Sequence, residues 1–159
     1  MIPLSLNTLW EVQPFAEASG NTPPYIGFAE AGPFVNGPLG HSIELTAKAK
    51  EPTPLTVWVA DDAKAPLAGP RPRIPPVTVG FSKFRGSGAV TFSSERPAAE
   101  KAEFHGPSSA TFFGKASTTA TFSEPGDYVI RVVANDWTGE GGRGFQCCWS
   151  NARMKVSVK

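Results

Sequence analysis

The stretch TATFSEPGDYVIRVVAND, residues 119–136, decides the fold that we predict for this chain. It indicates a strand, a turn at Glu124-Pro125-Gly126 and a second, longer strand. After the turn, successive residues fall on two faces: Tyr128, Ile130, Val132 and Ala134 on one, and Val129, Arg131 and Val133 on the other. This period of two is typical of a sheet strand.

The spacing around Tyr128 gives the strand pair a more specific identity. Tyr128 follows Gly126 by two residues and precedes Ile130 by two, and Ile130 stands where antibody domains keep a cysteine. This arrangement resembles the tyrosine corner of immunoglobulin-like sandwiches. We therefore expect Tyr128 to be buried, with its hydroxyl bonded to a backbone group near the Pro125 turn.

Further strands are predicted wherever the same alternation recurs. They cover residues 42–49, 54–62, 77–84, 89–93, 111–113, 115–122, 127–135, 145–149 and 152–158. Residues 63–76 carry five prolines and are predicted to form a surface loop, as are residues 94–109. No helical periodicity appears over a full-length window. The predicted fold class is an all-β, immunoglobulin-like β-sandwich over residues 42–159.

Residues 1–41 differ from the rest and are predicted to form an extended N-terminal arm with at most a short strand. The arm is dense in Pro and Gly and carries Tyr25, Phe28 and Phe34. Aromatic side chains gain little from staying in water, so we expect them to contact protein. That protein is either the chain's own sandwich or a partner, which includes a second copy of the chain.

Composition bounds the remaining possibilities. A chain of 159 residues suits one domain with a real core, and 16 Gly with 16 Pro are ordinary for a strand-and-turn protein. A net charge of +1 gives no sign of nucleic-acid binding. No apolar run approaches the length of a membrane span. The N-terminus lacks a signal-peptide pattern, which fits a cytoplasmic protein, a mature form or an excised domain.

A family resemblance covers about residues 42–159. Asp61-Asp62, then VGFSKFRGSGAVTFS (residues 79–93), then residues 119–136 and a final KVSV follow one another in this order. This order resembles the bacterial PKD-like and REJ-related immunoglobulin-like modules of surface and secreted proteins. The resemblance implies a non-enzymatic structural or protein-interaction module, an accessory domain or subunit of a bacterial surface or periplasmic assembly. It also implies a periplasmic or extracellular location.

Catalytic and cofactor sites find no support in the sequence. The two histidines, His41 and His105, both fall in predicted loops, and no G-x-S-x-G motif occurs. Zinc and blue-copper sites need ligand spacings that are absent here. We predict no enzyme activity and no cofactor.

Two other groups of residues could bind a ligand. Asp61, Asp62, Asn135 and Asp136 end predicted strands and are candidate Ca²⁺ ligands, although Asp and Asn also simply end strands and open turns. Trp137 and Trp149 flank a glycine-rich loop and, with Phe145, could bind a carbohydrate, a small ligand or a protein partner. The alternative is that these rings cap the core.

The adjacent cysteines Cys147 and Cys148 are the last unusual feature. Neighbouring side chains in a strand point to opposite faces, so both thiols cannot enter one core. One alternative is a buried Cys beside a half-exposed one. The other is a vicinal disulfide, which would strain the intervening peptide and require an oxidising compartment.

Overall fold

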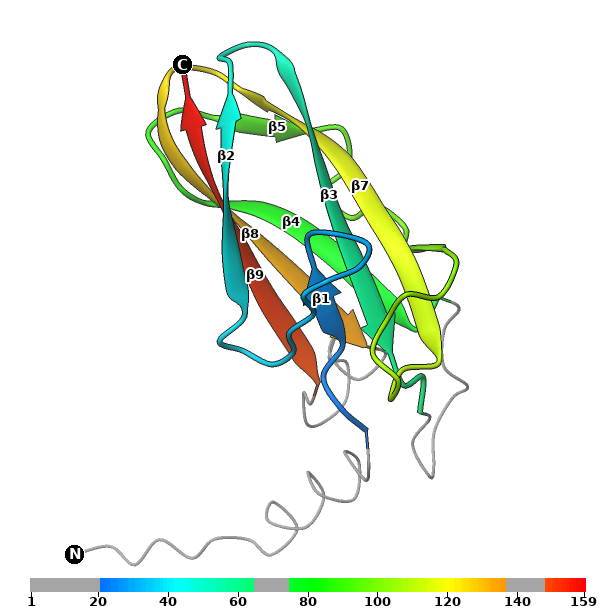
Figure 1. The fold of residues 1–159 in the computed structure, drawn as a ribbon. Coiled ribbons are helices and arrows are strands. Elements are labelled where there is room, and N and C mark those ends of the chain that lie inside the picture. The colour runs from blue at the N-terminus through cyan, green and yellow to red at the C-terminus, as the bar shows by residue number, and fades with distance from the viewer. Residues whose placement is uncertain (1–20, 65–74, 137–147) are drawn as a thin grey trace, which may run out of the picture.

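The computed structural model describes residues 21–64, 75–136 and 148–159, and these ranges form two packed β-sheets (Figure 1). Their strands are β1 (Tyr25–Gly27), β2 (His41–Ala47), β3 (Pro52–Asp61), β4 (Val77–Arg85), β5 (Val90–Phe92), β6 (Glu100–Lys101), β7 (Phe112–Phe122), β8 (Gly126–Asp136) and β9 (Trp149–Val158). None of the described residues forms a helix that is long and apolar enough to cross a membrane.

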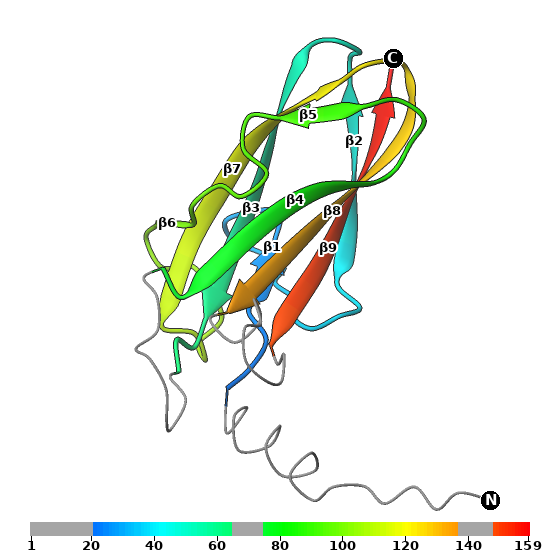
Figure 2. The ribbon, with the colours of Figure 1, turned by 180° about the vertical axis from the view of Figure 1, so that it is seen from behind.

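The strand order confirms the predicted fold class. One sheet has the order β1-β3-β7-β5, with β6 also paired to β7, and the other has the order β2-β9-β8-β4. Figure 2 shows the two layers from behind, with β4, β8 and β9 running side by side. The strands divide between the two sheets as in an immunoglobulin-like sandwich, with β1 at the edge of one sheet and β2 at the edge of the other.

Alternation along each strand builds the core between the layers. On β8, Tyr128, Ile130 and Val132 point inward and are buried, and on β9 Met154 and Val156 do the same. The facing sheet contributes buried residues from β3 and β7, including Leu55, Val57, Ala116 and Phe122. Burial of this apolar surface is the main favourable contribution to folding.

The described part of the predicted arm, residues 21–41, packs on the chain's own sandwich. β1 pairs with β3, and Ile26 is fully buried in the core. Ile26 also exchanges two backbone hydrogen bonds with Val35. The chain then crosses to the other layer, where β2 runs parallel to β9. The role of residues 1–20 stays a prediction, because they lie outside the described residues.

Other differences from the predicted strands have local causes. The predicted strands 111–113 and 115–122 form one strand, β7, since Gly114 continues the ladder against β3. β6 lies in a segment predicted to be a loop; it is two residues long, too short to show an alternating pattern. The last strand begins at Trp149 and runs without interruption through Asn151.

Tyr128 forms the predicted tyrosine corner. Its side chain is 1% exposed, and its hydroxyl donates to the carbonyl of Glu124 at 2.8 Å. The same oxygen accepts a hydrogen bond from the Gly88 amide at 3.2 Å. A Cβ on Gly88 would lie only 2.4 Å from the Tyr128 hydroxyl oxygen, so the turn can approach the ring only with glycine there. The corner thus joins the start of β8 to the turn between β4 and β5.

We expect Tyr128→Phe to lower the free energy of unfolding by about 1 kcal/mol or more, because the buried Gly88 amide loses its acceptor. The change is measured as a shift of the urea midpoint. Tyr25→Phe is the control, since the Tyr25 hydroxyl bond to Ser109 is exposed. Equal midpoints for wild type and Tyr128→Phe would contradict the energetic role of the corner.

Candidate interaction site

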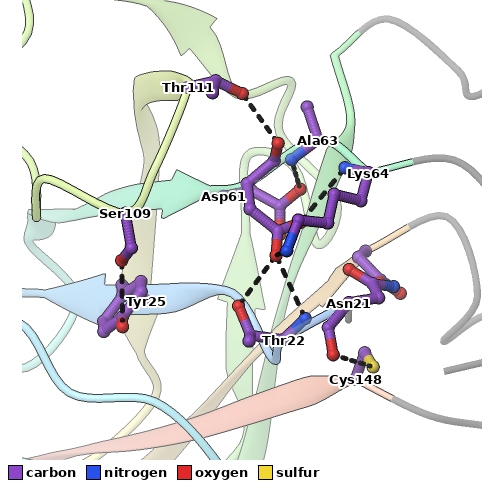
Figure 3. A network of polar contacts seen from close by, with 11 residues as sticks. Asn21, Thr22, Tyr25, Asp61, Ala63, Lys64, Ser109, Thr111 and Cys148 are labelled. Carbon is purple, nitrogen blue, oxygen red and sulfur yellow. Dashed lines mark hydrogen bonds and ion pairs between the residues drawn. The ribbon is translucent and has the colours of Figure 1, made fainter. Parts of the chain in front are cut away.

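Polar side chains form a network of contacts (Figure 3) at the end of the sandwich where β3 and β8 finish (Figure 1). Asn21 Nδ2 donates to Asp136, and the amide and hydroxyl of Thr22 donate to Asp62 at 3.2 and 3.1 Å. Nearby, the Ser150 hydroxyl donates to the Pro24 carbonyl. These bonds fasten residues 21–24 across the ends of both sheets, so they position β1 at the edge of its sheet.

Asp61 is a buried carboxyl group at this end of the sandwich. Its side chain is 1% exposed and Oδ2 accepts the Ala63 amide at 2.8 Å, while the buried Oδ1 has no hydrogen-bond partner among the described residues. Burial raises the pKa of Asp61 to about 7. The Ala63 hydrogen bond opposes this rise, and the nearby charges of Asp62 and Asp136 add to it. Asp61 is thus a carboxyl group that the fold favours in its protonated form.

The four candidate Ca²⁺ ligands do not all face one another. Asp61 and Asp136 point inward and are buried, whereas Asn135 lies on the opposite face of β8, paired with Trp149 of β9. Asp62 is occupied by Thr22, by the Lys64 amide and by the Lys64 ammonium at 3.6 Å. Within the described ranges, no group of three or more acidic, His or Cys side chains is arranged to hold a metal ion.

The raised pKa of Asp61 makes stability depend on pH. The folded state holds this proton more tightly than the unfolded chain does. The contribution of Asp61 to the free energy of unfolding is therefore complete below its ordinary pKa of 3.8 and is lost as pH rises toward and past 7. Asn at this position does not titrate. We therefore expect the free energy of unfolding of Asp61→Asn, relative to that of wild type, to rise by up to about 4 kcal/mol between pH 4 and pH 8.

Denaturant unfolding of both proteins across this pH range measures the difference. Asp127→Asn, at an exposed position on β8, is the matched control for removing one carboxylate from the chain. A constant difference between Asp61→Asn and wild type from pH 4 to pH 8 would show that Asp61 has an ordinary pKa.

Cys148 is disulfide-bonded in the structure and lies buried just before β9. Its sulfur, which has no hydrogen to donate, is 4.0 Å from the Asn21 carbonyl oxygen. The chain contains two cysteines, so Cys147 is the partner that the sequence offers. Cys147 lies outside the described residues, and the vicinal pairing therefore stays a prediction.

Mass spectrometry of the unfolded monomer tests this pairing. We expect no alkylated thiol under non-reducing conditions and two after reduction, since a vicinal ring consumes both thiols within one chain. The protein is handled without added reductant, and Cys147→Ser gives the reference for a chain with one thiol. Two alkylated thiols before reduction would rule the ring out.

Aromatic residues form a second, separate group on the outer face of the sheet that contains β3 and β7. Phe113 is at its centre: Trp58 stacks on it at 5.4 Å between ring centroids, and Phe34, Phe104 and His105 meet it edge-on at 5.7, 5.8 and 6.3 Å. Tyr25 packs against the same group. We call these six residues the aromatic cluster.

The aromatic cluster is built from three separate segments: residues 25–34, β3, and β7 together with the loop before it. Trp58 of β3 and Phe113 of β7 occupy outward-facing positions, because side chains alternate along a strand and their neighbours Val57 and Phe112 point into the core. Residues 25–34 and the loop before β7 then fold over them. Phe113 is fully buried, but Phe104 remains 46% exposed at the surface. The outcome is a small apolar layer outside the main core, with one large ring open to solvent.

The structure divides the aromatic residues that the sequence singled out. Tyr25 and Phe34 belong to the aromatic cluster, as described above. Phe28 packs against the main core instead, with its ring 4.6 Å from that of His41. Trp149 is half-buried on the outer face of the β2-β9-β8-β4 sheet. Trp137, Phe145 and the glycine-rich loop lie outside the described residues.

Two central residues of the aromatic cluster, Phe104 and Phe113, were not predicted. No sequence motif marks Trp58, Phe104 or Phe113. Trp58 lies in β3, Phe104 in the loop between β6 and β7, and Phe113 in β7. The one available signal was alternation, because Trp58 and Phe113 occupy outward-facing positions of strands where a polar residue is expected.

Comparison with known protein families finds no match, and comparison with curated proteins finds none either. Among solved structures, the chain is similar to the ASH / PapD-like domain of human CEP192 (PapD-like domain 7), with 12% identity and a TM-score of 0.45. The alignment covers 100% of this chain and 92% of that chain. The strand order of the sandwich therefore rests on the structure itself, and the PKD-like resemblance stays a prediction.

Proposed function

We propose that this chain is a non-enzymatic protein-interaction module and that the aromatic cluster is its docking surface. The exposure of Phe104 carries the proposal: a large ring that is 46% exposed lies on a layer of five other rings. Aromatic side chains supply much of the binding energy at protein interfaces, because they bury a large area and lose little conformational freedom.

The surroundings of the aromatic cluster suit a protein partner. Polar and charged groups border it: Glu30 lies 3.7 Å from His105, Ser109 donates to the Tyr25 hydroxyl, and the Lys115 ammonium is 5.6 Å from the Trp58 ring centre. An apolar centre with a polar rim is the usual composition of such an interface. The occupant proposed here is a partner protein that inserts an apolar side chain beside Phe104.

The N-terminal arm enters this proposal through its described part. Tyr25 and Phe34 form one side of the aromatic cluster, so a partner that docks on Phe104 also contacts the arm. Self-association through the arm is a variant in which the partner is a second copy. Sedimentation of the purified chain over a range of concentrations separates the two cases.

We propose that the chain is located in the bacterial periplasm or at the cell surface, where it is an accessory domain or subunit of an assembly. The disulfide of Cys148 supports an oxidising compartment, because structural disulfides are rare in the cytosol. The PKD-like resemblance supports the same location.

A carbohydrate- or small-ligand-binding module using Trp137, Trp149 and the glycine-rich loop is the second candidate function. The observation that favours it is the position of Trp149, half-buried on an outer sheet face rather than in the core. A glycan array decides between the two, since binding that Trp149→Ala abolishes would support the second function.

Phe104→Ser tests the docking surface. We expect this variant to lose at least about tenfold in affinity for the partner, as expected for an interface hot spot. Phe84→Ser is the matched control, because Phe84 is also exposed (65%) but lies on β4 of the other sheet. The partner is first captured by crosslinking to wild-type protein, then purified and titrated against all three proteins.

A partner that binds wild type and Phe84→Ser equally, and Phe104→Ser weakly, supports the proposal. Equal binding of all three proteins would place the docking surface elsewhere. Circular dichroism and thermal unfolding of the two variants show that each is folded before binding is measured.

A further inference from the structure

The outer face of the β2-β9-β8-β4 sheet collects basic side chains. Met154 and Val156 of β9 enter the core, so Arg153 and Lys155 point away from it, and Arg131 of β8 does so for the same reason. Arg85 of β4 pairs in register with Val129 and lies on this face as well. All four side chains are exposed. We call Arg85, Arg131, Arg153 and Lys155 the basic face.

Two of these residues repel each other. Arg131 and Arg153 are directly opposite in the antiparallel ladder between β8 and β9, where like charges are unfavourable. Arg131 Nη2 donates to Asn151 Oδ1 at 3.4 Å, which leaves its charge uncompensated. No ion pair is found for Arg153 or Arg85 with any described residue. The arrangement therefore costs stability in the free chain, and an anion placed between the two guanidinium groups would remove that cost.

The residues that flank this pair in the same row of the sheet are small and polar. The register continues outward from Arg153 to Ser42 and from Arg131 to Ser82, both exposed, so a hydroxyl stands at each end of the row. Gly80, on the next row of β4, has open space where a side chain would be. An extended chain can thus lie flat across the sheet and reach both arginines.

A hollow of about 670 Å³ adjoins the basic face, bordered by Arg85 and Lys155. Two carboxylates also border it: Glu44, whose Oε1 is 3.5 Å from Lys155 Nζ, and Asp127 at the end where β8 begins. Val129 lies between Arg85 and Lys155 in the register and gives the hollow an apolar floor. These acids place the strongest excess of positive charge at Arg131 and Arg153.

We infer that the basic face binds an acidic, Asp- or Glu-rich segment of a partner protein, with carboxylates held by Arg131 and Arg153. Arginine forms paired, charge-assisted hydrogen bonds with a carboxylate, and Ser42 and Ser82 can donate further ones. The hollow takes the continuation of the segment between Arg85 and Lys155. This surface is on the sheet opposite the aromatic cluster, so the inference is independent of the proposed function.

A short fluorescein-labelled oligoglutamate peptide is the probe, with oligolysine as the peptide control, and binding is followed by fluorescence anisotropy. We expect Arg131→Gln/Arg153→Gln to bind oligoglutamate at least about tenfold more weakly than wild type, since each lost charge-assisted pair is a strong contact. Binding to wild type should weaken as salt is raised.

Lys101→Gln/Lys115→Gln is the matched control, because it removes the same charge from exposed positions on the other sheet. Phe104→Ser should bind oligoglutamate like wild type, which separates this test from that of the aromatic cluster. Thermal unfolding confirms that each variant is folded, and Arg153→Gln alone replaces the double variant if the latter is not.

Two outcomes would overturn the inference. Wild type could fail to bind oligoglutamate, or the arginine variant could bind it as tightly as wild type does. In the first case, phosphatidylserine vesicles that bind wild type but not the arginine variant would make this face a lipid-binding surface.

Discussion

The hydroxyl of Tyr128 fixes the geometry on which the sandwich depends. It bonds to Glu124 on one side and to Gly88 on the other, and so joins the turn before β8 to the turn after β4. Because β8 lies between β4 and β9, fixing its start sets the register of both neighbours. Every position that points into the core or out of it follows from that register.

Much of the fold could be predicted because long strands carry their own pattern. Residues 127–135 and 152–158 alternate over enough positions to show both the strand and its inward face. β1 and β6 could not be predicted in the same way, as three and two residues give no period. The place of β1 depends on side-chain bonds such as Thr22 to Asp62, which join segments 40 residues apart.

The candidate sites were less accessible to prediction, for two different reasons. The aromatic cluster assembles from segments around residues 25, 58 and 104 that share no local signal. The basic face had a signal that composition concealed: a net charge of +1 averages over the chain, whereas alternation places Arg131, Arg153 and Lys155 on a single face. Charge needs to be counted by face rather than by chain.

The parallel pairing of β2 with β9 has a mechanical consequence. The two strands run in the same direction from His41 beside Ala152 to Ala47 beside Val158. A force that pulls the chain before β2 one way and the chain after β9 the other loads this ladder along its length. All of its backbone hydrogen bonds then bear the load together instead of opening one at a time. If the domain is held at both ends, it resists stretching through shear between its first long strand and its last.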